Sequence, residues 1–326
     1  MIYFFFSLEQ QLEDSEVSAL CRKFGKDISL LPNEIDSFFK GITTTFRKNG
    51  LYWWMFVHID FIKLLEKSNI QEKDLKDIQR KINYYLYFIF DPNDKSLTLI
   101  RLDFRFDAVV PLKEHRELLL KLYKKTAEKY GFKRKYDLYE TSIYFNSESV
   151  KIICYDKEAE RKAKGEDIRP SEENVLRFEV CLLNRHLNYM KKTYGLEKCL
   201  ESYMNNEFWT KYMKGNICPI FFKGNYYKIN TATKIIEESN FKDRDKKKLR
   251  NFLCDVSKHG IHGVKRLMVK DSKGILKPKY SKYLFSKYIR MLEELNINPI
   301  LIPKNYKVAF GKDKFISNPL DFLQSS

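Results

Sequence analysis

A tyrosine and a lysine two positions apart could act as a nucleophile and its charged neighbour. They are Tyr155 and Lys157. In an extended strand, residues i and i+2 project to the same side, so the two side chains would lie together while that geometry lasts. A phenol has a pKa of about 10, and an adjacent ammonium group or metal ion lowers the cost of forming its phenolate. The pair is a weak signal alone, because the chain has 21 tyrosines and most tyrosines have structural positions.

Three segments alternate apolar and charged residues, which predicts strands at 54–60, 97–107 and 175–183. The second segment is the sharpest. Opposite Leu102, Phe104 and Phe106, it places four charged residues on one face: Arg101, Asp103, Arg105 and Asp107. The third segment places Arg177 and Glu179 on one face. An antiparallel sheet with one face in water would give the same alternation, so a solvated charged face is the alternative.

Each of these strands offers at least one hard ligand for a metal ion on the face opposite its apolar residues: His58 or Asp60, Asp103 or Asp107, and Glu179. If the strands are neighbours, these groups converge. Two carboxylates and one imidazole suit Mg²⁺ or Mn²⁺ and could equally take other divalent ions. The flanking arginines would keep the carboxylates ionised and offer forks for phosphate; they are Arg101, Arg105 and Arg177. A hard cation on a basic surface indicates phosphodiester chemistry.

The overall charge favours a polyanionic partner. The 326-residue chain has 60 Lys and Arg against 43 Asp and Glu, a formal net charge of +17. A globular protein with so much self-repulsion usually binds a polyanion, and nucleic acid is the first candidate. Hydrophobic residues make up 44% of the chain, which is enough to bury a core, so the chain is expected to fold.

Several functional classes lose their support. The sequence has no run of about 18 apolar residues, and the apolar stretch 2–6 is too short for a signal peptide, so we expect no membrane span and a cytoplasmic location. The six cysteines include no C-x-x-C pair, which predicts reduced, mostly buried thiols rather than a zinc ribbon or a disulfide scaffold. Glycine-rich phosphate loops are absent from the sequence, which removes the main support for an ATPase or a dinucleotide-binding enzyme.

The remaining patterns predict an α+β protein with an antiparallel sheet and a helical C-terminal region. A hairpin is expected between 141–145 and 150–155, with its turn at 146–149. The aromatic run 84–90 fits either a strand or the end of a helix that starts at residue 75. The other expected helices are 112–130, 156–164, 196–213, 231–239, 243–258 with Asp243 as its N-cap, 264–269 and 280–295. We expect domains at 1–200 and 201–326, with a soft boundary.

Four segments resemble the rolling-circle replication initiators of filamentous phages and related plasmid initiators. They are I-R-L-D-F-R-F-D at 100–107, the segment 141–160 with its Y-D-K, the segment 175–187 with its R-F-E, and the helical segment 252–267. Their order and spacing are similar to the family's R-x-D strand, its strand ending in Y-x-K, and its R-x-E strand before a basic helix. The resemblance covers roughly residues 50 to 300 and is strongest at 97–187.

The resemblance implies a metal-dependent tyrosine endonuclease in residues 1–200, on a sheet of the HUH-like nuclease type (palm or RRM-like). Tyr155 would attack one strand of origin DNA and become joined to the 5′ phosphate, with Lys157 beside it. Asp103 and Glu179 would hold a divalent ion, Mg²⁺ or Mn²⁺, that polarises the scissile phosphate. Such a protein would nick and religate single-stranded origin DNA to start rolling-circle replication.

Two features depart from the family's pattern. Many rolling-circle nucleases present a His-hydrophobic-His pair to the metal, whereas the corresponding strand here reads V-H-I-D at 57–60. His58 is therefore either the third ligand or an edge histidine, and Asp60 stays an alternative ligand. The nucleophile segment supplies one tyrosine rather than a closely spaced pair, so termination would use water, a second protomer or Tyr155 twice.

DNA contacts are expected from the strands, the hairpin and the last helix. The nick site must be single-stranded or extruded, which favours aromatic platforms and a basic groove. Candidates are Arg101, Arg105 and Arg177 on the strands, Tyr139, Tyr144 and Lys151 on the hairpin, and Lys279, Lys282, Lys287 and Arg290 on the last helix. There the cations are interleaved with Tyr283, Leu284 and Ile289, which also fits an amphipathic helix with a solvated basic face. If the helix is functional, residues 201–326 would bind duplex origin DNA beside the nick.

Two other functions fit the same residues. A relaxase that nicks a mobile element would show the same motifs, and only its genetic surroundings would differ. A sequence-specific DNA-binding protein without catalysis would show the same basic surface, and it would lose nothing when Tyr155 is replaced by Phe. A host helicase, a host polymerase and a second copy of the chain are further candidate partners beside the DNA.

Overall fold

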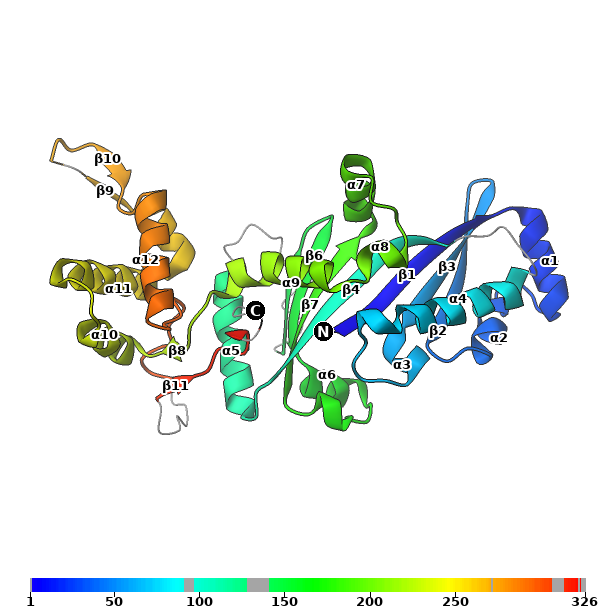
Figure 1. Cartoon of the computed structure of the whole chain (residues 1–326), viewed down its shortest axis with the longest axis horizontal. Coiled ribbons are helices and arrows are strands. Elements are labelled where there is room, and N and C mark those ends of the chain that lie inside the picture. Colours follow the sequence, from blue (N-terminus) through cyan, green and yellow to red (C-terminus); the bar gives the residue numbers. More distant parts are fainter. Residues whose placement is uncertain are drawn as a thin grey trace. The chain divides into compact units, whose positions relative to one another are not determined.

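The computed structural model describes residues 2–90, 97–127, 141–270, 272–306, 314–321 and 323. Seven strands form one antiparallel sheet in the order β2-β3-β1-β4-β7-β6-β5 (Figure 1). Their bounds are β1 (Ile2–Leu12), β2 (Ile42–Asn49), β3 (Tyr52–Asp60), β4 (Thr98–Val109), β5 (Ser142–Asn146), β6 (Val150–Asp156) and β7 (Val175–Leu183). The mixed class and the antiparallel sheet predicted from the sequence are confirmed.

Contacts within the chain divide it into two compact units. The first consists of residues 1–106, 147–152 and 179–213, and the second of residues 107–146, 153–178 and 214–326. Strands β4, β6 and β7 each have residues in both units. The division of nuclease and DNA-binding functions near residue 200 stays a prediction.

The first unit surrounds its part of the sheet with helices. They are α1 (Asp14–Phe24), α2 (Leu31–Ser37), α3 (Phe61–Leu65), α4 (Leu75–Phe90), α7 (Asn184–Tyr194) and α8 (Leu200–Tyr203), with a 3₁₀ turn at Glu72–Asp74. The aromatic run 84–90 ends α4 as a helix. Tyr85 and Ile89, four residues apart, are buried, whereas Tyr84 and Tyr87 are exposed, which is a helical period.

The second unit contains longer helices and short strands. The helices are α5 (Lys113–Ala127), α6 (Lys157–Lys164), α10 (Ile229–Glu238), α11 (Asp243–Lys265) and α12 (Lys282–Glu294), with a 3₁₀ turn at Pro170–Glu172, and α9 (Asn206–Phe221) begins in the first unit. The short strands are β8 (Tyr226–Tyr227), β9 (Met268–Lys270), β10 (Leu276–Pro278) and β11 (Phe315–Ile316). Aromatic rings fill its core: the rings of Tyr123 and Phe221 are 4.4 Å apart, and Tyr226 donates a hydrogen bond to the Tyr123 hydroxyl. The predicted helix 112–130 corresponds to α5, and its last residues lie outside the described ranges.

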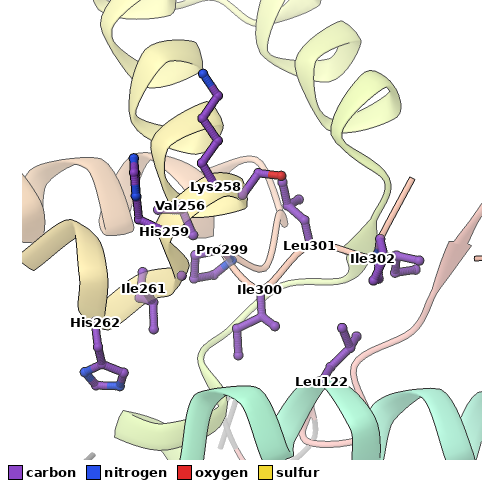
Figure 2. Close-up of a pocket in the computed structure, with 13 residues that line it drawn as sticks. Leu122, Val256, Lys258, His259, Ile261, His262, Pro299, Ile300, Leu301 and Ile302 are labelled. Carbon is purple, nitrogen blue, oxygen red and sulfur yellow. The ribbon is translucent and has the colours of Figure 1, made fainter. Parts of the chain in front are cut away.

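Gly260 interrupts α11. The prediction of a separate helix at 264–269 was wrong. The φ of 70° and ψ of 163° at Gly260 are not helical, and a positive φ is adopted easily by glycine. The chain resumes its helix only as far as Lys265, and residues 268–270 form β9. A pocket of about 370 Å³ with both polar and apolar walls lies beside this break, and Figure 2 shows Ile261, Ile300 and Leu122 among the residues that line it.

Two details of the helical region differ from expectation. Lys242 is the N-cap of α11, and Asp243 is its first helical residue, where a carboxylate still interacts favourably with the helix dipole. On α12, Tyr283 is 69% exposed rather than part of the apolar face. The buried face of α12 consists of Tyr288, Met291 and Leu292. The helix begins at Lys282, after Ser281 caps it.

The expectations about the cysteines and about membrane spans can be compared with the structure. Two of the six free cysteines, Cys154 and Cys181, are buried and the other four are half-buried, so the prediction of mostly buried thiols was wrong. Among the described residues, the structure contains no helix with the length and apolar character of a membrane span.

Candidate active site

The charged faces of β4 and β7 are buried rather than solvated. Only 2% of Asp103, 3% of Arg105, 5% of Glu179 and none of Arg177 is exposed. A charged group that leaves water is stable only with a partner, so each of these side chains is expected to be held by specific contacts. The alternative of an ordinary water-facing strand surface is therefore wrong for these four residues.

Arg101 holds Asp103 through a two-pronged ion pair. The Arg101 Nε donates to Oδ1 of Asp103 at 2.9 Å, and its terminal nitrogen donates to Oδ2 at 2.6 Å. Burial alone would lower the pKa of Arg101, but the bonds to Asp103 raise it. Both carboxylate oxygens of the predicted metal ligand are thus engaged by a guanidinium that lies two residues away on the same strand.

The Cys181 thiol lies near both predicted acidic ligands. Burial, followed by the negative charges of Asp103 and Glu179, raises the pKa of the Cys181 thiol, so both carboxylates lie near this sulfur and keep it protonated. The terminal nitrogen of Arg101 is 3.9 Å from the same sulfur. The sequence analysis did not select Cys181, although its position two residues after Glu179 places it on the same strand face.

His58 faces Ser7 on the neighbouring strand. Its Nδ1 lies 2.8 Å from the Ser7 hydroxyl, and the register places Ser7 opposite His58 on β3 and opposite Arg101 on β4. Burial lowers the pKa of His58, and the charges of Arg101 and Arg47 lower it further. The imidazole is therefore neutral at pH 7, which is the form that binds metal ions.

Asp60 has a structural task at the end of β3. Its Oδ1 accepts hydrogen bonds from the backbone N–H groups of Ile62 at 3.0 Å and Lys63 at 3.2 Å, which caps α3. The same residue was the alternative third metal ligand. Helix capping accounts for Asp60 without a metal, so His58 is the stronger of the two candidates.

The metal site expected at Asp103, Glu179 and His58 stays a prediction. Within the described ranges, no three His, Cys, Asp or Glu side chains are grouped as metal ligands would be. Both oxygens of Asp103 are already bonded to Arg101. An ion at Asp103 would first require this guanidinium to turn away.

Tyr155 lies between two cations in the second unit. The Lys157 Nζ is 5.9 Å from the centre of the Tyr155 ring, and the guanidinium of Arg177 is 6.0 Å from it. Strand β6 ends at Asp156, and Lys157 is the first residue of α6. The predicted proximity of Tyr155 and Lys157 is present, but a strand-to-helix junction produces it rather than continued extended geometry. Tyr155 itself is half-buried.

Acidic residues hold Lys157 in place. Its Nζ donates to Glu160 at 2.6 Å and lies 3.9 Å from Glu172. Burial lowers the pKa of Lys157, and Arg177 and Arg161 add to this effect, although Glu160 opposes it. An ammonium group with a lowered pKa gives up a proton more readily than an exposed lysine does.

Arg177 forms the second two-pronged pair of the charged strands. Its Nε donates to Oδ1 of Asp107 at 2.7 Å and its terminal nitrogen donates to Oδ2 at 2.9 Å. Asp107, the alternative to Asp103 as a metal ligand, is thereby engaged by Arg177. The fork also positions this guanidinium beside the Tyr155 ring.

Arg116 is a buried residue that the sequence analysis missed. Its guanidinium donates to Asp156 at 2.7 Å, to the Val110 carbonyl at 2.8 Å and to Asn174 at 2.9 Å. Asp156 in turn accepts from the Ala159 backbone and caps α6, so Arg116 fixes the junction between Tyr155 and Lys157. Its position three residues before buried Leu119 was the available signal, because it places a charge on the apolar stripe of the helix.

The candidate DNA contacts have different surroundings. Arg105 is buried and donates to the Ser68 carbonyl at 3.2 Å. Lys279 is paired with Asp255 and Lys287 with Asp245, whereas Lys282 and Arg290 are exposed. On the hairpin, Tyr144 and Lys151 are half-buried, and Tyr139 lies outside the described residues.

Comparison with known families identifies the central part of the chain. Residues 84–206 match the family of phage replication-associated proteins that is defined by the N-terminal part of the gene II protein. This segment is similar to a filamentous-phage replication protein. It contains β4, β6 and β7, and therefore Asp103, Tyr155 and Glu179. The resemblance seen in the sequence is confirmed over residues 84–206, the segment 252–267 lies outside the match, and the match indicates a role in phage DNA replication. A comparison with curated proteins gives no match.

Proposed function

We propose that the protein is a rolling-circle replication initiator that nicks and religates single-stranded origin DNA through Tyr155. The observation that carries the proposal is the match to phage replication proteins over the segment with all three strand motifs. The nearness of the Lys157 and Arg177 cations to the Tyr155 ring supports it, because a tyrosine nucleophile needs neighbouring positive charge for its phenolate. We assign the fold to the HUH-like nuclease type as part of the same proposal.

The proposed reaction is a strand transfer that conserves the phosphodiester. The Tyr155 oxygen attacks the scissile phosphorus and forms a phosphotyrosine bond, while the bond from phosphorus to the 3′ oxygen breaks. The phenol loses its proton and the leaving 3′ oxygen gains one, so the products are a 5′-linked protein and a free 3′ hydroxyl. Attack by a new 3′ hydroxyl on the phosphotyrosine reverses these steps, so religation needs no ATP. A host polymerase could extend the free 3′ end, and a host helicase could separate the strands ahead of it.

Exposure decides which of the forked arginines can hold the phosphate that this reaction needs. Planar guanidinium groups bind phosphate oxygens in the same two-pronged way as they bind carboxylates. Arg177 lies beside the Tyr155 ring but is fully buried, whereas the Arg101 side chain is 36% exposed, so Arg101 is the candidate for holding a phosphate.

A divalent ion, Mg²⁺ or Mn²⁺, is the proposed cofactor, with Asp103, Glu179 and His58 as its ligands. The ion would supply positive charge for the scissile phosphate. Because Arg101 occupies both oxygens of Asp103, we expect the protein alone to bind such an ion weakly. The Arg101→Gln variant should bind Mn²⁺ more tightly than the wild type in calorimetry, whereas Asp103→Asn should bind it less tightly. If Arg101→Gln does not change the affinity for Mn²⁺, the proposed ligand set is wrong.

The decisive experiment is the trapping of a covalent adduct. The full chain is incubated with labelled single-stranded origin DNA and Mn²⁺, and a denaturing gel resolves any protein–DNA adduct. The Y155F variant should form no adduct and should keep its affinity for the oligonucleotide. The control is Y87F, which removes an exposed phenol from α4 and should leave adduct formation intact.

Each outcome of this experiment has a clear meaning. An adduct that persists in Y155F excludes Tyr155 as the nucleophile. DNA binding without any adduct in the wild type favours the non-catalytic DNA-binding protein over the initiator. An adduct with the transfer origin of a mobile element, but not with a replication origin, favours the relaxase, which shares the chemistry.

A further inference from the structure

The hairpin of β9 and β10 stands clear of the helices around it. Met268, Val269 and Lys270 of β9 pair with Pro278, Lys277 and Leu276 of β10. The hairpin follows α11, precedes α12 and projects beyond both helices (Figure 1). Of its six paired residues, five are exposed and Val269 is half-buried, so neither face is covered by the part of the second unit that the structure describes.

Apolar side chains lie on this uncovered hairpin. Ile275 is 60% exposed, Leu276 is 61% exposed and Met268 is 46% exposed. Two-stranded hairpins are marginally stable in water by themselves, and a group of exposed apolar residues marks an interaction site. The hairpin therefore has the properties of a surface that a partner covers.

Lysines surround these apolar side chains. Residues 268–279 include four lysines and a single acidic residue, Asp271. Lys270, Lys273 and Lys277 are exposed. The register places Lys270 beside Leu276 and Lys277 beside Val269, so the positive charge lies on both faces of the hairpin. Such a surface fits a polyanion that also offers apolar contacts.

The base of the hairpin is anchored while its tip is open. The backbone N–H of Lys279 donates to the Leu267 carbonyl at 2.7 Å, just below the paired residues. The hydroxyl of Tyr280 donates to Asp255 of α11 at 2.6 Å. At the tip, Gly274 has a φ of 77°, which a side-chain-bearing residue would adopt only with strain. A fixed base means that less conformational entropy is lost when the hairpin binds.

We propose that the β9–β10 hairpin is a duplex-DNA-binding ribbon. Lys270, Lys273 and Lys277 contact backbone phosphates, and Ile275 and Leu276 lie against the bases in the minor groove. Two-stranded ribbons fit DNA grooves, and minor-groove proteins commonly combine cations on the phosphates with apolar side chains at a base step. This inference rests on the proposed function in one respect, that DNA is the substrate. It adds a second contact region, next to the exposed Lys282 of α12, that the reaction at Tyr155 does not need.

The proposed contacts of the hairpin lysines with DNA phosphates are tested by the salt dependence of duplex binding. The full chain with Lys270, Lys273 and Lys277 changed to Gln is compared with the wild type on a labelled duplex at a series of salt concentrations. Each phosphate that the protein no longer neutralises should lower the slope of log affinity against log salt by about 0.9, so we expect a fall of about two to three. The matched control changes Lys73, Lys76 and Lys81, three exposed lysines of the first unit, and should leave the slope unchanged.

The proposed contacts of Ile275 and Leu276 with the bases are tested by base unstacking. A fluorescent adenine analogue in the duplex brightens when its stacking is disturbed, and the wild type should cause this increase. The I275S/L276S variant should lose the increase while it keeps the wild-type salt slope. If the variant brightens the analogue as strongly as the wild type, the apolar tip does not lie against the bases.

These outcomes separate the hairpin from the proposed nicking reaction. On a single-stranded oligonucleotide, both hairpin variants should form the Tyr155 adduct like the wild type. If the hairpin lysine variant and the control lysine variant bind duplex DNA equally, the hairpin inference is overturned and the nicking proposal stands. If the wild type forms no adduct but the hairpin lysines still set the salt slope, the nicking proposal fails and the ribbon stands. Binding of an acidic protein instead would leave duplex binding unchanged, and this would also overturn the inference.

Discussion

Two positively charged regions of this protein differ in how their charges are held. On β4 and β7, the guanidinium of each of Arg101 and Arg177 is fixed by both oxygens of a carboxylate. On the β9–β10 hairpin, the lysines are exposed to solvent. The net charge of +17 includes both regions, so it indicates an anionic partner without indicating where that partner binds. Burial separates charges that maintain the fold from charges that a ligand can reach.

The physical difference lies in solvation. A buried charge that loses its partner remains without water or a counter-charge, which makes removal of one partner expensive. An exposed charge is hydrated and screened by salt, so its loss changes stability little but changes the affinity for a polyanion. The following predictions test this contrast, from the largest expected effect to the smallest.

The largest effect is expected at Arg116. Replacing it with Met leaves the buried Asp156 carboxylate without its guanidinium partner. We expect a loss of about 3–5 kcal/mol in the free energy of unfolding, measured by urea denaturation. The exposed Lys282, changed to Met in the same way, should change that free energy by less than about 0.5 kcal/mol. Similar losses for both variants would contradict the contrast between buried and exposed charge.

The pair of Arg177 and Asp107 tests whether the buried fork itself stabilises the fold. R177M alone should cost about 3 kcal/mol, because the Asp107 carboxylate loses its two-pronged partner. Adding D107L should recover much of that loss, since an apolar pair of similar volume needs no counter-charge. Urea denaturation of both single variants and the double variant measures the coupling. A double variant as unstable as the sum of the singles would show that the two side chains act independently.

Acid should lower the free energy of unfolding by protonating Glu172, which lies near Lys157 and Arg177. Burial would raise the pKa of Glu172, but Arg161, Lys157 and Arg177 outweigh burial and lower it. A carboxyl whose pKa is lowered by folding stabilises the protein above its unfolded pKa of about 4.3 and loses this contribution as the pH falls through the folded value. The wild type should therefore lose stability below about pH 4.5 more steeply than E172Q does. Urea denaturation from pH 6 to 3 checks this, and equal slopes would contradict it.

The smallest effect is expected for the ion pair between Lys287 and Asp245. The two side chains are about one third exposed, and the Nζ–Oδ1 distance is 3.0 Å. K287M should lower the unfolding temperature only slightly, and 0.5 M salt should reduce the difference from the wild type further because such pairs are screened. Thermal unfolding at low and high salt provides the measurement. A cost that approaches that of R116M would place α12 with the buried network instead.

Local pattern was sufficient for much of the sheet. The alternation in 175–183 predicts β7 with the observed bounds, and 97–107 predicts most of β4. Alternation succeeds here because an apolar face has to meet the core wherever the strand lies in the sheet. The aromatic run 84–90 was undecided, since seven apolar residues fit either period until the packing of Tyr85 and Ile89 is known.

Sequence reasoning was less complete for the candidate site. It selected Tyr155, Lys157 and Arg177, and the structure brings these three together. It expected the flanking arginines to keep the carboxylates ionised, but it did not pair Arg177 with Asp107 or Arg116 with Asp156. The strand pattern predicts on which face a charged side chain lies. Its ion-pair partner depends on strands and helices that are distant in the chain.

The amino-acid order alone determined the strand motifs, the excess of positive charge and the similarity of residues 84–206 to phage replication proteins, because these depend on residue type and spacing. Only the tertiary structure decided that the charged faces are buried, that Arg101 occupies Asp103, and that the lysines of the β9–β10 hairpin are exposed. The reason is that the cost of a charge depends on its surroundings, and segments distant in the chain provide those surroundings.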